Sequence, residues 1–291
     1  MSASPGARIA KRFAALAADG RAGLVTFVTA GDPDRETAAA ILDGLPKAGA
    51  DVIELGMPFS DPMADGPVIQ ASSLRALRAG QKMATTLDAV RRFRTRDPDT
   101  PVVLMGYYNP IYRYGDARFS QDAASAGVDG LIVVDLPPEE EGELRPHATE
   151  AGLSLIRLVS PNTSDARIAA LMKGTSGFVY HVSITGITGT RSAEASGVAK
   201  VVRRIRAATS LPVAVGFGIR TPEQAAEIAR VADAAVVGSA IVQKIADGLD
   251  AGGRARPDTA TSVLDYVSEL ARGVRAARND EARAAGRGAH T

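Results

Sequence analysis

Eight short runs of apolar and β-branched residues recur along the chain, and an amphipathic stretch separates each run from the next. The runs occupy residues 24–30, 51–56, 101–107, 130–135, 154–160, 178–183, 212–218 and 234–240. Runs of this kind predict buried strands, whereas stretches such as 35–49 and 164–174 have the apolar spacing of helices and begin at or after a capping residue. The sequence therefore predicts eight consecutive βα units, which implies an α/β protein with a parallel sheet.

Eight such units within about 250 residues match a (β/α)8 barrel. We expect an extra N-terminal helix near 6–18 and a C-terminal helix near 258–278. The alternative is a doubly wound sheet, which normally has about five or six strands and carries its glycine fingerprint after the first strand. Here A-G-D-P-D begins at the last residue of the first run, and the glycine elements G-F-G and G-S-A end the last two. We expect a single barrel domain over 1–279 and a disordered tail over 280–291, which has no apolar face.

Charge and cysteine content narrow the class of function. The 291 residues carry a formal net charge of +1 at pH 7, so the overall charge indicates neither a nucleic-acid groove nor a membrane surface. The chain has no cysteine, which excludes disulfides, thiolate nucleophiles and cysteine metal ligands. No apolar run approaches the roughly 20 residues that cross a bilayer, and the first residues lack a signal-peptide core. We expect a cytoplasmic protein without nucleic-acid or membrane partners.

Barrel enzymes build their active sites at the C-terminal ends of the strands. Polar residues at or after these predicted ends are Glu54, Asp65, Tyr107, Asn109, Asp135, Ser160, Asn162 and Tyr180. Because the strand ends of a barrel share one face, these residues are candidates for a common site.

Glu54 is the most informative of them. In V-I-E-L-G, it shares a face with Val52 and Gly56, and in a barrel that face is an interior where an ionised carboxylate is unfavourable. A buried Glu54 with a raised pKa could exchange protons near neutrality while a more solvated Asp65 stays charged. The structural alternatives are a core Glu54 bound to a backbone donor and an Asp65 that serves an Asp-Gly turn. Asp61, before a proline, fits a turn or surface residue better.

Two glycine elements, G-F-G (216–218) and G-S-A (238–240), end the seventh and eighth runs. Each alone fits a simple turn. Together they place backbone N–H groups after the last two strands, with Ser239 opening a helix, which is the usual phosphate site of this fold. Gly189 could complete that site.

Two connections, from Gly56 to about Val68 and from Ser183 to about Ala195, exceed the usual two to six residues. Long, glycine-rich barrel loops favour lids that exclude water, although tolerated insertions are the alternative.

Other catalytic chemistries find no support in the strand segments. None of the runs contains a lysine, so a Schiff-base aldolase is not indicated. Of the three histidines, His181 must point toward the helices if Tyr180 faces inward, His147 lies on a polar helix and His290 lies in the tail. We therefore expect no metal site, and carboxylate acid–base chemistry remains.

Six segments resemble the family of tryptophan synthase α subunits. They are E-L-G-M-P-F-S-D-P-M-A-D-G-P, F-V-T-A-G-D-P, V-V-D-L-P, Y-H-V-S-I-T-G-I-T-G-T, G-F-G-I and V-V-G-S-A-I-V. The resemblance extends over roughly residues 8–275. It implies a (β/α)8 barrel that cleaves indole-3-glycerol phosphate to indole and glyceraldehyde 3-phosphate by a retro-aldol reaction without a cofactor.

The resemblance also implies a role for each matching residue. Glu54 would be the general acid–base, and Asp65 would bind the indole N–H. The indole pocket would contain Phe27, Tyr107 and Tyr180, with Thr188 closing toward Asp65. The phosphate would be bound by Gly189, Gly218, Gly238 and Ser239.

The family further implies a β subunit that carries pyridoxal phosphate, in an α2β2 heterotetramer. Pro58, Asp61 and Asn109 fall in loops that the family uses at this interface. Ile184 stands where some relatives have arginine, so any salt bridge that this arginine makes is absent here, and we expect lid closure to be tuned differently. Open alternatives are another phosphate-binding barrel enzyme, a glycosidase, which would also use two carboxylates, and a non-catalytic barrel that regulates the β subunit.

Overall fold

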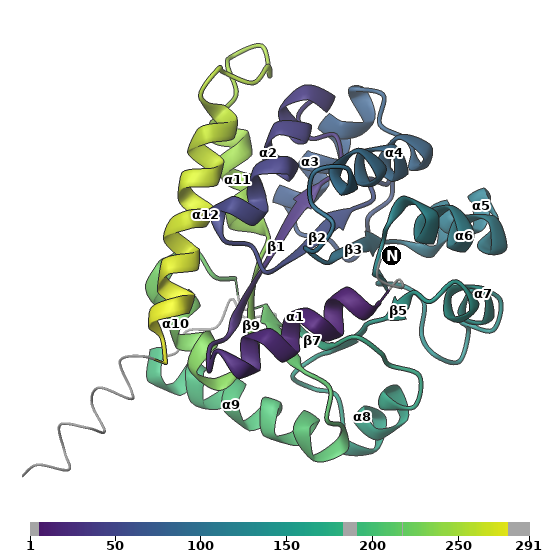
Figure 1. The fold of residues 1–291 in the computed structure, drawn as a ribbon, viewed down its shortest axis with the longest axis vertical. Helices are drawn as coiled ribbons and strands as arrows, with labels where there is room; N and C mark the ends of the chain where they lie inside the picture. Colours follow the sequence, from purple (N-terminus) through teal and green to yellow (C-terminus); the bar gives the residue numbers. More distant parts are fainter. Residues whose placement is uncertain (1–5, 183–190, 217, 279–291) are drawn as a thin grey trace, which may run out of the picture.

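The computed structural model describes residues 6–182, 191–216 and 218–278. Within these residues, nine parallel strands form one sheet in the order β5-β4-β3-β2-β1-β9-β8-β7-β6. The strands are β1 (Gly23–Thr29), β2 (Val52–Gly56), β3 (Val102–Gly106), β4 (Gly130–Val133), β5 (Ser154–Leu155), β6 (Arg157–Val159), β7 (Val179–Val182), β8 (Val213–Gly216) and β9 (Ala234–Val237). The sheet curls into a nearly closed barrel (Figure 1), as the sequence predicts.

The predicted fifth strand, 154–160, is divided at Ile156. Its first half, β5, pairs with β4, and its second half, β6, pairs with β7. The Ile156 N–H itself bonds to the Leu131 carbonyl at 3.0 Å. One extended run therefore changes pairing partner halfway along, and its two halves bring the ends of the sheet together. Periodicity alone does not reveal such a change.

Helices surround the strands (Figure 1). They are α1 (Ala7–Ala18), α2 (Arg35–Ala48), α3 (Pro67–Arg78), α4 (Met83–Arg94), α5 (Tyr108–Tyr114), α6 (Asp116–Ala126), α7 (Leu144–Glu150), α8 (Asp165–Met172), α9 (Arg191–Ala208), α10 (Pro222–Val231), α11 (Ser239–Asp247) and α12 (Thr259–Ala276). The expected N-terminal and C-terminal helices are both present. Two units differ from the simple βα repeat, because β2 and β3 are each followed by two helices. Helix α9 begins at Arg191, earlier than the predicted Ala195.

Local sequence explains where several helices begin. Asp34, Ser164 and Thr221 each accept a hydrogen bond from the backbone N–H three residues later, which satisfies a donor that the first helical turn leaves free. Gly49 ends α2 with φ of 109°, a left-handed conformation that glycine adopts most readily. These caps determine where the helices begin and end, and therefore how long the loops around the barrel are.

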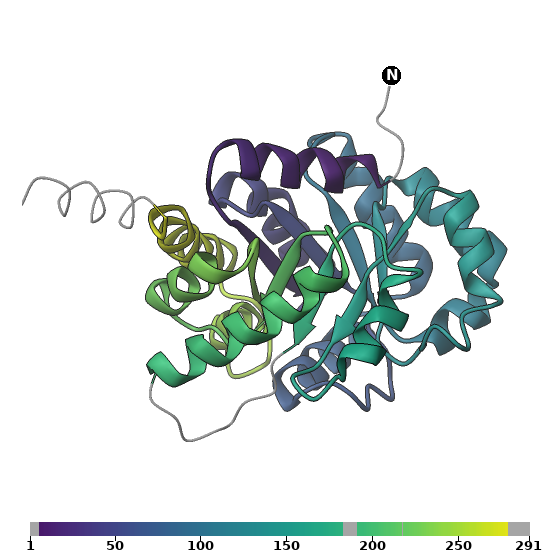
Figure 2. The same cartoon turned by 90° about the horizontal axis from the view of Figure 1, so that it is seen from below.

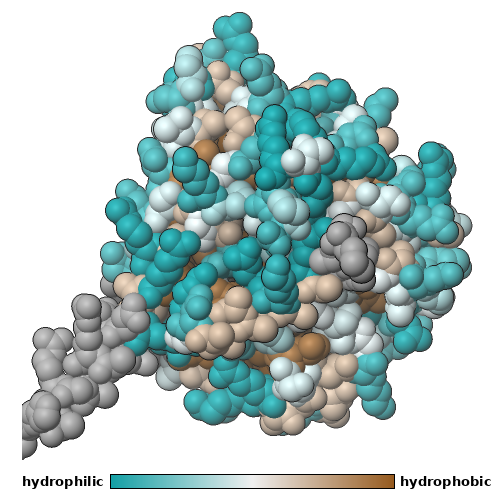
Figure 3. Space-filling view, viewed as in Figure 1, coloured by the Kyte–Doolittle hydropathy of each residue, from teal (hydrophilic) through white to brown (hydrophobic). Residues whose placement is uncertain are grey.

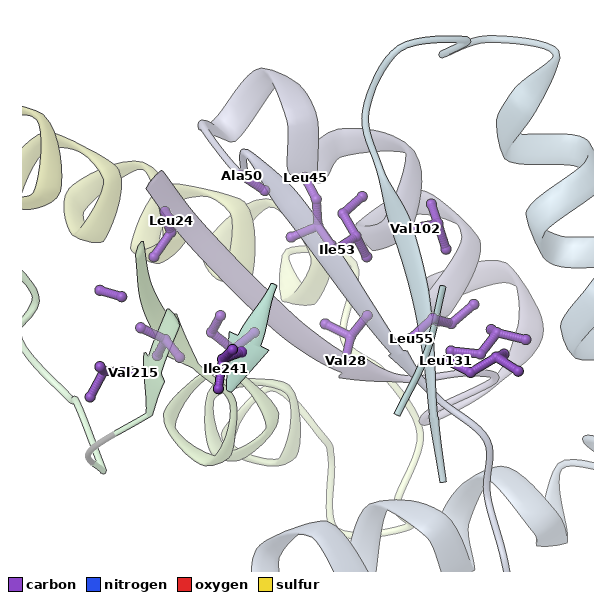
Figure 4. Packing of buried hydrophobic residues seen from close by; sticks show 14 of the residues in the cluster. Leu24, Val28, Leu45, Ala50, Ile53, Leu55, Val102, Leu131, Val215 and Ile241 are labelled. Carbon is purple, nitrogen blue, oxygen red and sulfur yellow. The ribbon is translucent and has the colours of Figure 1, made fainter. Parts of the chain in front are cut away.

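Two apolar layers stabilise the barrel. The inner layer includes Val25, Val52, Val103 and Ile156, and α1 adds Ile9, Phe13 and Leu16 to it. Figure 2 shows α1 lying across one end of the barrel. The outer layer lies between strands and helices, and Figure 4 shows its members from both, including Ile53 and Leu55 of β2 and Leu45 of α2. The face that carries α1 is mostly hydrophilic, with small separate hydrophobic areas (Figure 3).

Three aspartates reinforce the end of the barrel where the strands begin. Asp51, Asp129 and Asp233 each directly precede a strand, and each accepts a hydrogen bond from a backbone N–H in the first residues of the neighbouring strand. Each also pairs with arginine, and the buried Asp129 pairs with both Arg8 (2.9 Å) and Arg94 (2.7 Å). Paired charged groups therefore stabilise this end of the barrel. The candidate active site lies at the opposite end.

Candidate active site

A cavity of about 320 Å³ lies at the C-terminal ends of the strands, and it brings together eight of the residues that the sequence singles out. They are Phe27, Glu54, Asp65, Tyr107, Tyr180, Gly218, Gly238 and Ser239. Pro58, Asp61 and Asn109, assigned to a partner interface, do not line it. Thr188, Gly189 and Ile184 lie outside the described residues, so their predicted roles stay predictions.

Glu54 sits in the middle of β2, where it is level with Phe27 of β1 and Val103 of β3. Its side chain is fully buried, and neither carboxylate oxygen has a hydrogen-bond partner among the described residues. Burial disfavours the charged form and raises the pKa of Glu54 from 4.5 to about 8. Because the alternative of a core carboxylate bound to a backbone donor would need such a partner, the geometry disfavours it.

Tyr180 of β7 lines the same cavity, and its hydroxyl interacts electrostatically with Glu54. Burial raises the pKa of Tyr180 well above its ordinary value, and the negative charge of Glu54 adds to this shift. Gly216 of β8 leaves room for the tyrosine, since a Cβ at that position would lie 2.7 Å from the Tyr180 hydroxyl oxygen. His181 points the other way, as predicted: it is buried, and its Nδ1 lies 2.8 Å from the Val159 carbonyl oxygen.

Asp65 belongs to the connection between β2 and α3 and is only half-buried. Burial raises its pKa, while hydrogen bonding from the Tyr107 hydroxyl lowers it and so offsets part of the shift. Tyr107 also fixes the connection, because its hydroxyl oxygen accepts a hydrogen bond from the Ala64 N–H at 3.0 Å. Burial, with the Asp65 charge as a smaller cause, raises the pKa of Tyr107 to about 12. Tyr107 therefore remains a neutral hydrogen-bond donor.

Another part of the cavity wall is built from glycines and the start of α11. Gly218 has φ of 62°, a left-handed conformation. Ser239 is the first residue of α11, so unpaired backbone N–H groups and the positive end of the helix dipole face this part of the cavity. Gly238 also makes room for the pocket wall, since a Cβ there would lie 3.2 Å from the Cβ of Phe27. The arrangement suits an anionic group.

Several polar candidates lie elsewhere. Asp135 is exposed and accepts a hydrogen bond from the Tyr108 N–H at 2.8 Å, at the start of α5. Asn109 lies in the first turn of α5 rather than in a loop, because that helix begins directly after Tyr107. Ser160 bonds to Thr163 in its own turn. The sequence places these residues near strand ends but does not reveal that short helices and turns use them locally.

The cavity is also lined by Gly216 and Ala240 of the two glycine elements and by Gly56, which shares the face of Glu54. The lining residues that the sequence did not indicate are Thr29, Met57, Ile69, Ser73, Met105, Gly106, Val134, Val182, Ile219, Arg220 and Val236. Inward alternation along the strands would have found Met105 and Val134. Ile69 and Ser73, four residues apart, present one face of α3 to the cavity, and helical spacing could have indicated that. Arg220 follows Gly218 by two residues, outside the strand and helix patterns, so periodicity does not indicate that it lines the cavity.

Within the described ranges, no group of three or more histidine, cysteine, aspartate or glutamate side chains is arranged to hold a metal ion. None of the helices formed by these described residues is both long and apolar enough to cross a membrane.

The site sets two carboxylates in contrasting environments beside glycine turns and a helix N-terminus, at the C-terminal end of a (β/α)8 barrel. Fold and site thus define the class of barrel enzymes whose active site lies at the strand ends. The family model of the tryptophan synthase alpha chain matches residues 13–275. The chain belongs to this family.

Curated relatives and solved structures agree with the family model. The tryptophan synthase alpha chain of Gluconacetobacter diazotrophicus is 59% identical over 93% of this chain and 99% of its own length. The alpha chain of Acidiphilium cryptum is 58% identical over 93% of this chain and 98% of its own length. The crystal structure of the alpha subunit from Legionella pneumophila is 39% identical, covers 94% of this chain and 99% of that one, and has a TM-score of 0.85. A tryptophan synthase structure from Mycobacterium tuberculosis is 37% identical, with coverage of 92% and 98% and a TM-score of 0.82.

As a member of this family, the chain is a lyase that cleaves indole-3-glycerol phosphate in tryptophan biosynthesis. In the same family, a β subunit is the partner and carries pyridoxal phosphate.

Proposed function

We propose that Glu54 and Asp65 perform the retro-aldol cleavage of indole-3-glycerol phosphate to indole and glyceraldehyde 3-phosphate. The observation that carries this proposal is the state of Glu54: it is buried, lines the cavity, lacks a hydrogen-bond partner among the described residues and has a pKa of about 8. At pH 7 such a carboxyl group is mostly protonated and can act as an acid.

The reaction then proceeds in two proton transfers. Protonated Glu54 donates its proton to C3 of the indole ring, and positive charge develops on the ring nitrogen. The bond between C3 and the glycerol chain breaks, and its electron pair restores the neutral ring. The hydroxyl on the adjacent glycerol carbon becomes the aldehyde carbonyl, and its proton passes to the Glu54 carboxylate. Glu54 ends the cycle protonated, as it began.

Asp65 and the aromatic residues hold the indole during these steps. An ionised Asp65 accepts a hydrogen bond from the indole N–H and stabilises the developing positive charge. Phe27, Tyr107 and Tyr180 line the cavity around Glu54 and supply apolar contact for the ring. Thr188, predicted to close toward Asp65, would complete this part of the site.

The substrate phosphate binds at the wall formed by Gly218, Gly238 and Ser239. Backbone N–H groups at the start of α11 donate to the phosphate oxygens, and the helix dipole favours the negative charge. Gly189 would add a further donor. The phosphate thereby anchors the glycerol chain at a fixed distance from Glu54, which orients the scissile bond.

This subunit acts without a cofactor of its own, because Glu54 and Asp65 account for every proton and charge in the two steps. Pyridoxal phosphate belongs to the β subunit, which uses the released indole. The predicted cytoplasmic location stays a prediction.

The β subunit docks on the two connections that follow β2 and β3, in an α2β2 heterotetramer. Asp61 and Asn109 are exposed there, and Pro58 is half-buried. Two exposed large apolar side chains support this surface, Met63 beside Asp61 and Tyr112 on α5, with 85% and 58% of their area exposed. The connections contact each other, because the rings of Phe59 and Tyr107 lie 5.5 Å apart. A partner bound to this surface would therefore contact the connection between β2 and α3, which contains Asp65.

Indole release from indole-3-glycerol phosphate by the purified chain, with and without its β subunit, tests the proposal. We expect release that rises when the β subunit is added. Tight binding of glyceraldehyde 3-phosphate without release in either condition would instead favour a non-catalytic partner of the β subunit.

A further inference from the structure

The described residues that line the active-site cavity include three charged side chains: Glu54, Asp65 and Arg220. Two are acidic, and Arg220 alone is basic. A phosphate monoester brings a charge of about −1.5 to −2 at pH 7. The other two charged side chains of this cavity are carboxyl groups, so a nearby positive charge would strengthen binding of such a group beyond what backbone dipoles supply.

Arg220 lies on the wall assigned to the phosphate. It follows Gly218 by two residues and lines the cavity together with Ser239 and Ala240. The same three residues line an adjoining cavity, also of about 320 Å³, which includes Lys244 and Tyr266. Arg220 therefore stands at the boundary between the active site and this second cavity, beside the first turn of α11.

The backbone of Arg220 is held from both sides. Its N–H donates to the Gln224 side-chain oxygen at 2.8 Å, and its carbonyl oxygen accepts a hydrogen bond from the Tyr266 hydroxyl at 2.7 Å. Gln224 belongs to α10 and Tyr266 to α12, so two helices fix this residue. Its guanidinium, by contrast, takes part in none of the ion pairs among the described residues, and the residue is exposed. The main chain is fixed while the charge stays available for a ligand.

We propose that Arg220 binds the phosphate of the substrate with its guanidinium, opposite the N–H groups of α11. A guanidinium can donate two parallel hydrogen bonds to phosphate oxygens, and such charge-assisted bonds are the strong ones. This inference rests on the proposed placement of the phosphate beside Gly238 and Ser239. It makes Arg220 a determinant of selectivity for phosphorylated over unphosphorylated substrates.

The phosphate is remote from the bond that breaks, and this gives Arg220 a distinct kinetic signature. An interaction that is equally strong in the bound substrate and in the transition state raises KM when it is removed and leaves kcat nearly unchanged. Loss of Arg220 should therefore affect KM, whereas loss of Glu54 should affect kcat.

The test compares Arg220→Met, Arg220→Lys and a control, Arg230→Met, in the full chain. Arg230 is an exposed arginine in the last turn of α10 that lines neither cavity. Binding is measured by calorimetry with two probes, glyceraldehyde 3-phosphate and indole, of which only the first carries phosphate. We expect Arg220→Met to lower the affinity for glyceraldehyde 3-phosphate on the order of tenfold or more. The affinity for indole should stay unchanged. Arg220→Lys should recover part of the loss, and Arg230→Met should match the native chain.

Salt provides a second readout. Affinity of the native chain for glyceraldehyde 3-phosphate should fall as ionic strength rises, and Arg220→Met should show a weaker dependence. Unchanged phosphate affinity in Arg220→Met would overturn the proposal, and so would an equal loss for both probes, which would indicate a structural role. Because binding is measured without turnover, a native chain that binds the phosphate probe but releases no indole would count against the proposed reaction and not against Arg220. A native chain that fails to bind the probe would overturn both phosphate assignments.

Discussion

Glu54 and Asp65 face the same cavity, yet burial affects the two carboxyl groups to different extents. Glu54 has no hydrogen-bond partner among the described residues to support its charge, and its pKa rises to about 8. Asp65 is half-buried, and the Tyr107 hydroxyl counteracts part of the effect of burial on its pKa. Burial thus raises the pKa of both carboxyl groups, and at Asp65 a hydrogen bond offsets part of this effect. Such contrasting environments suit an acid paired with a charge-stabilising carboxylate.

The pH dependence of kcat/KM follows from these shifts. Glu54 must be protonated to begin the reaction, so kcat/KM should fall about tenfold per pH unit above its pKa of about 8. On the acid side, activity should fall as Asp65 gains a proton, through a pKa raised from 3.8. The measurement uses a saturating β subunit and verifies stability at each pH. A kcat/KM that stays constant from pH 7 to 10 would contradict the role of Glu54.

Alternation along the strands placed Glu54 on the interior face and put His181 on the face opposite Tyr180, whereas Phe27 was indicated only by the family resemblance. The contact between Tyr107 and Asp65 was not predictable in the same way. It depends on the path of the connection from 57 to 66, which the Ala64 hydrogen bond to Tyr107 helps to fix. Loop paths depend on such tertiary contacts, and no local period encodes them.

The two ends of the barrel strands differ in what their loops contribute. At the start of the strands, Asp51, Asp129 and Asp233 pair with arginines and with backbone N–H groups. At the other end, connections carry Asp65, Gly218 and Ser239 into the cavity. These three aspartates are thus paired at the end where they stabilise the fold, whereas Glu54 has no hydrogen-bond partner among the described residues at the end where chemistry is proposed.

This division predicts separate effects on stability and activity. Asp129→Asn removes a buried charge between Arg8 and Arg94, and we expect the free energy of unfolding to fall by about 3 kcal/mol. The folded variant should keep the native kcat/KM, since the residue lies at the end remote from the cavity. Denaturant unfolding measures the first quantity and indole release the second.

Asp99→Asn is the control for that variant. Asp99 pairs with Lys11 through largely exposed side chains, and such pairs contribute little, typically below about 1 kcal/mol. Equal stability of the two variants would show that the buried network does not stabilise the barrel.

Eight strand positions and the two flanking helices were evident from the repeated runs, because burial on both faces of a parallel sheet leaves a strong apolar signal. Three features were not. The division of the fifth strand, the helix pairs after β2 and β3, and the place of Asn109 within α5 depend on hydrogen bonding across the sheet and on short helices that lack a clear apolar stripe.

The whole molecule combines one closed and one open end. Helix α1 covers the start of the strands with Ile9, Phe13 and Leu16, and the cavity lies at their C-terminal ends. The surface proposed for the β subunit includes the connection between β2 and α3, which also carries Asp65 into the cavity. A β subunit bound to this surface would therefore contact the connection that carries Asp65.

Tyr112 provides a test of that surface. It is exposed on α5 and does not line the cavity, and buried tyrosines often dominate interface affinity. Tyr112→Ala should weaken binding of the β subunit on the order of tenfold, with little change in the activity of the isolated chain. Leu74→Ala, an exposed apolar residue on α3, serves as the control. Equal β-subunit affinity of Tyr112→Ala and the native chain would place the interface elsewhere.

The most direct test of the catalytic role of Glu54 compares the native chain with Glu54→Gln. This variant keeps the shape of the side chain but cannot exchange the proton. Indole release and affinity for glyceraldehyde 3-phosphate are measured side by side, with the β subunit present. We predict a fall in kcat of at least about a hundredfold and a phosphate-ligand affinity close to that of the native chain. Indole release by Glu54→Gln near the native rate would contradict the assignment of Glu54 as the group that moves the proton.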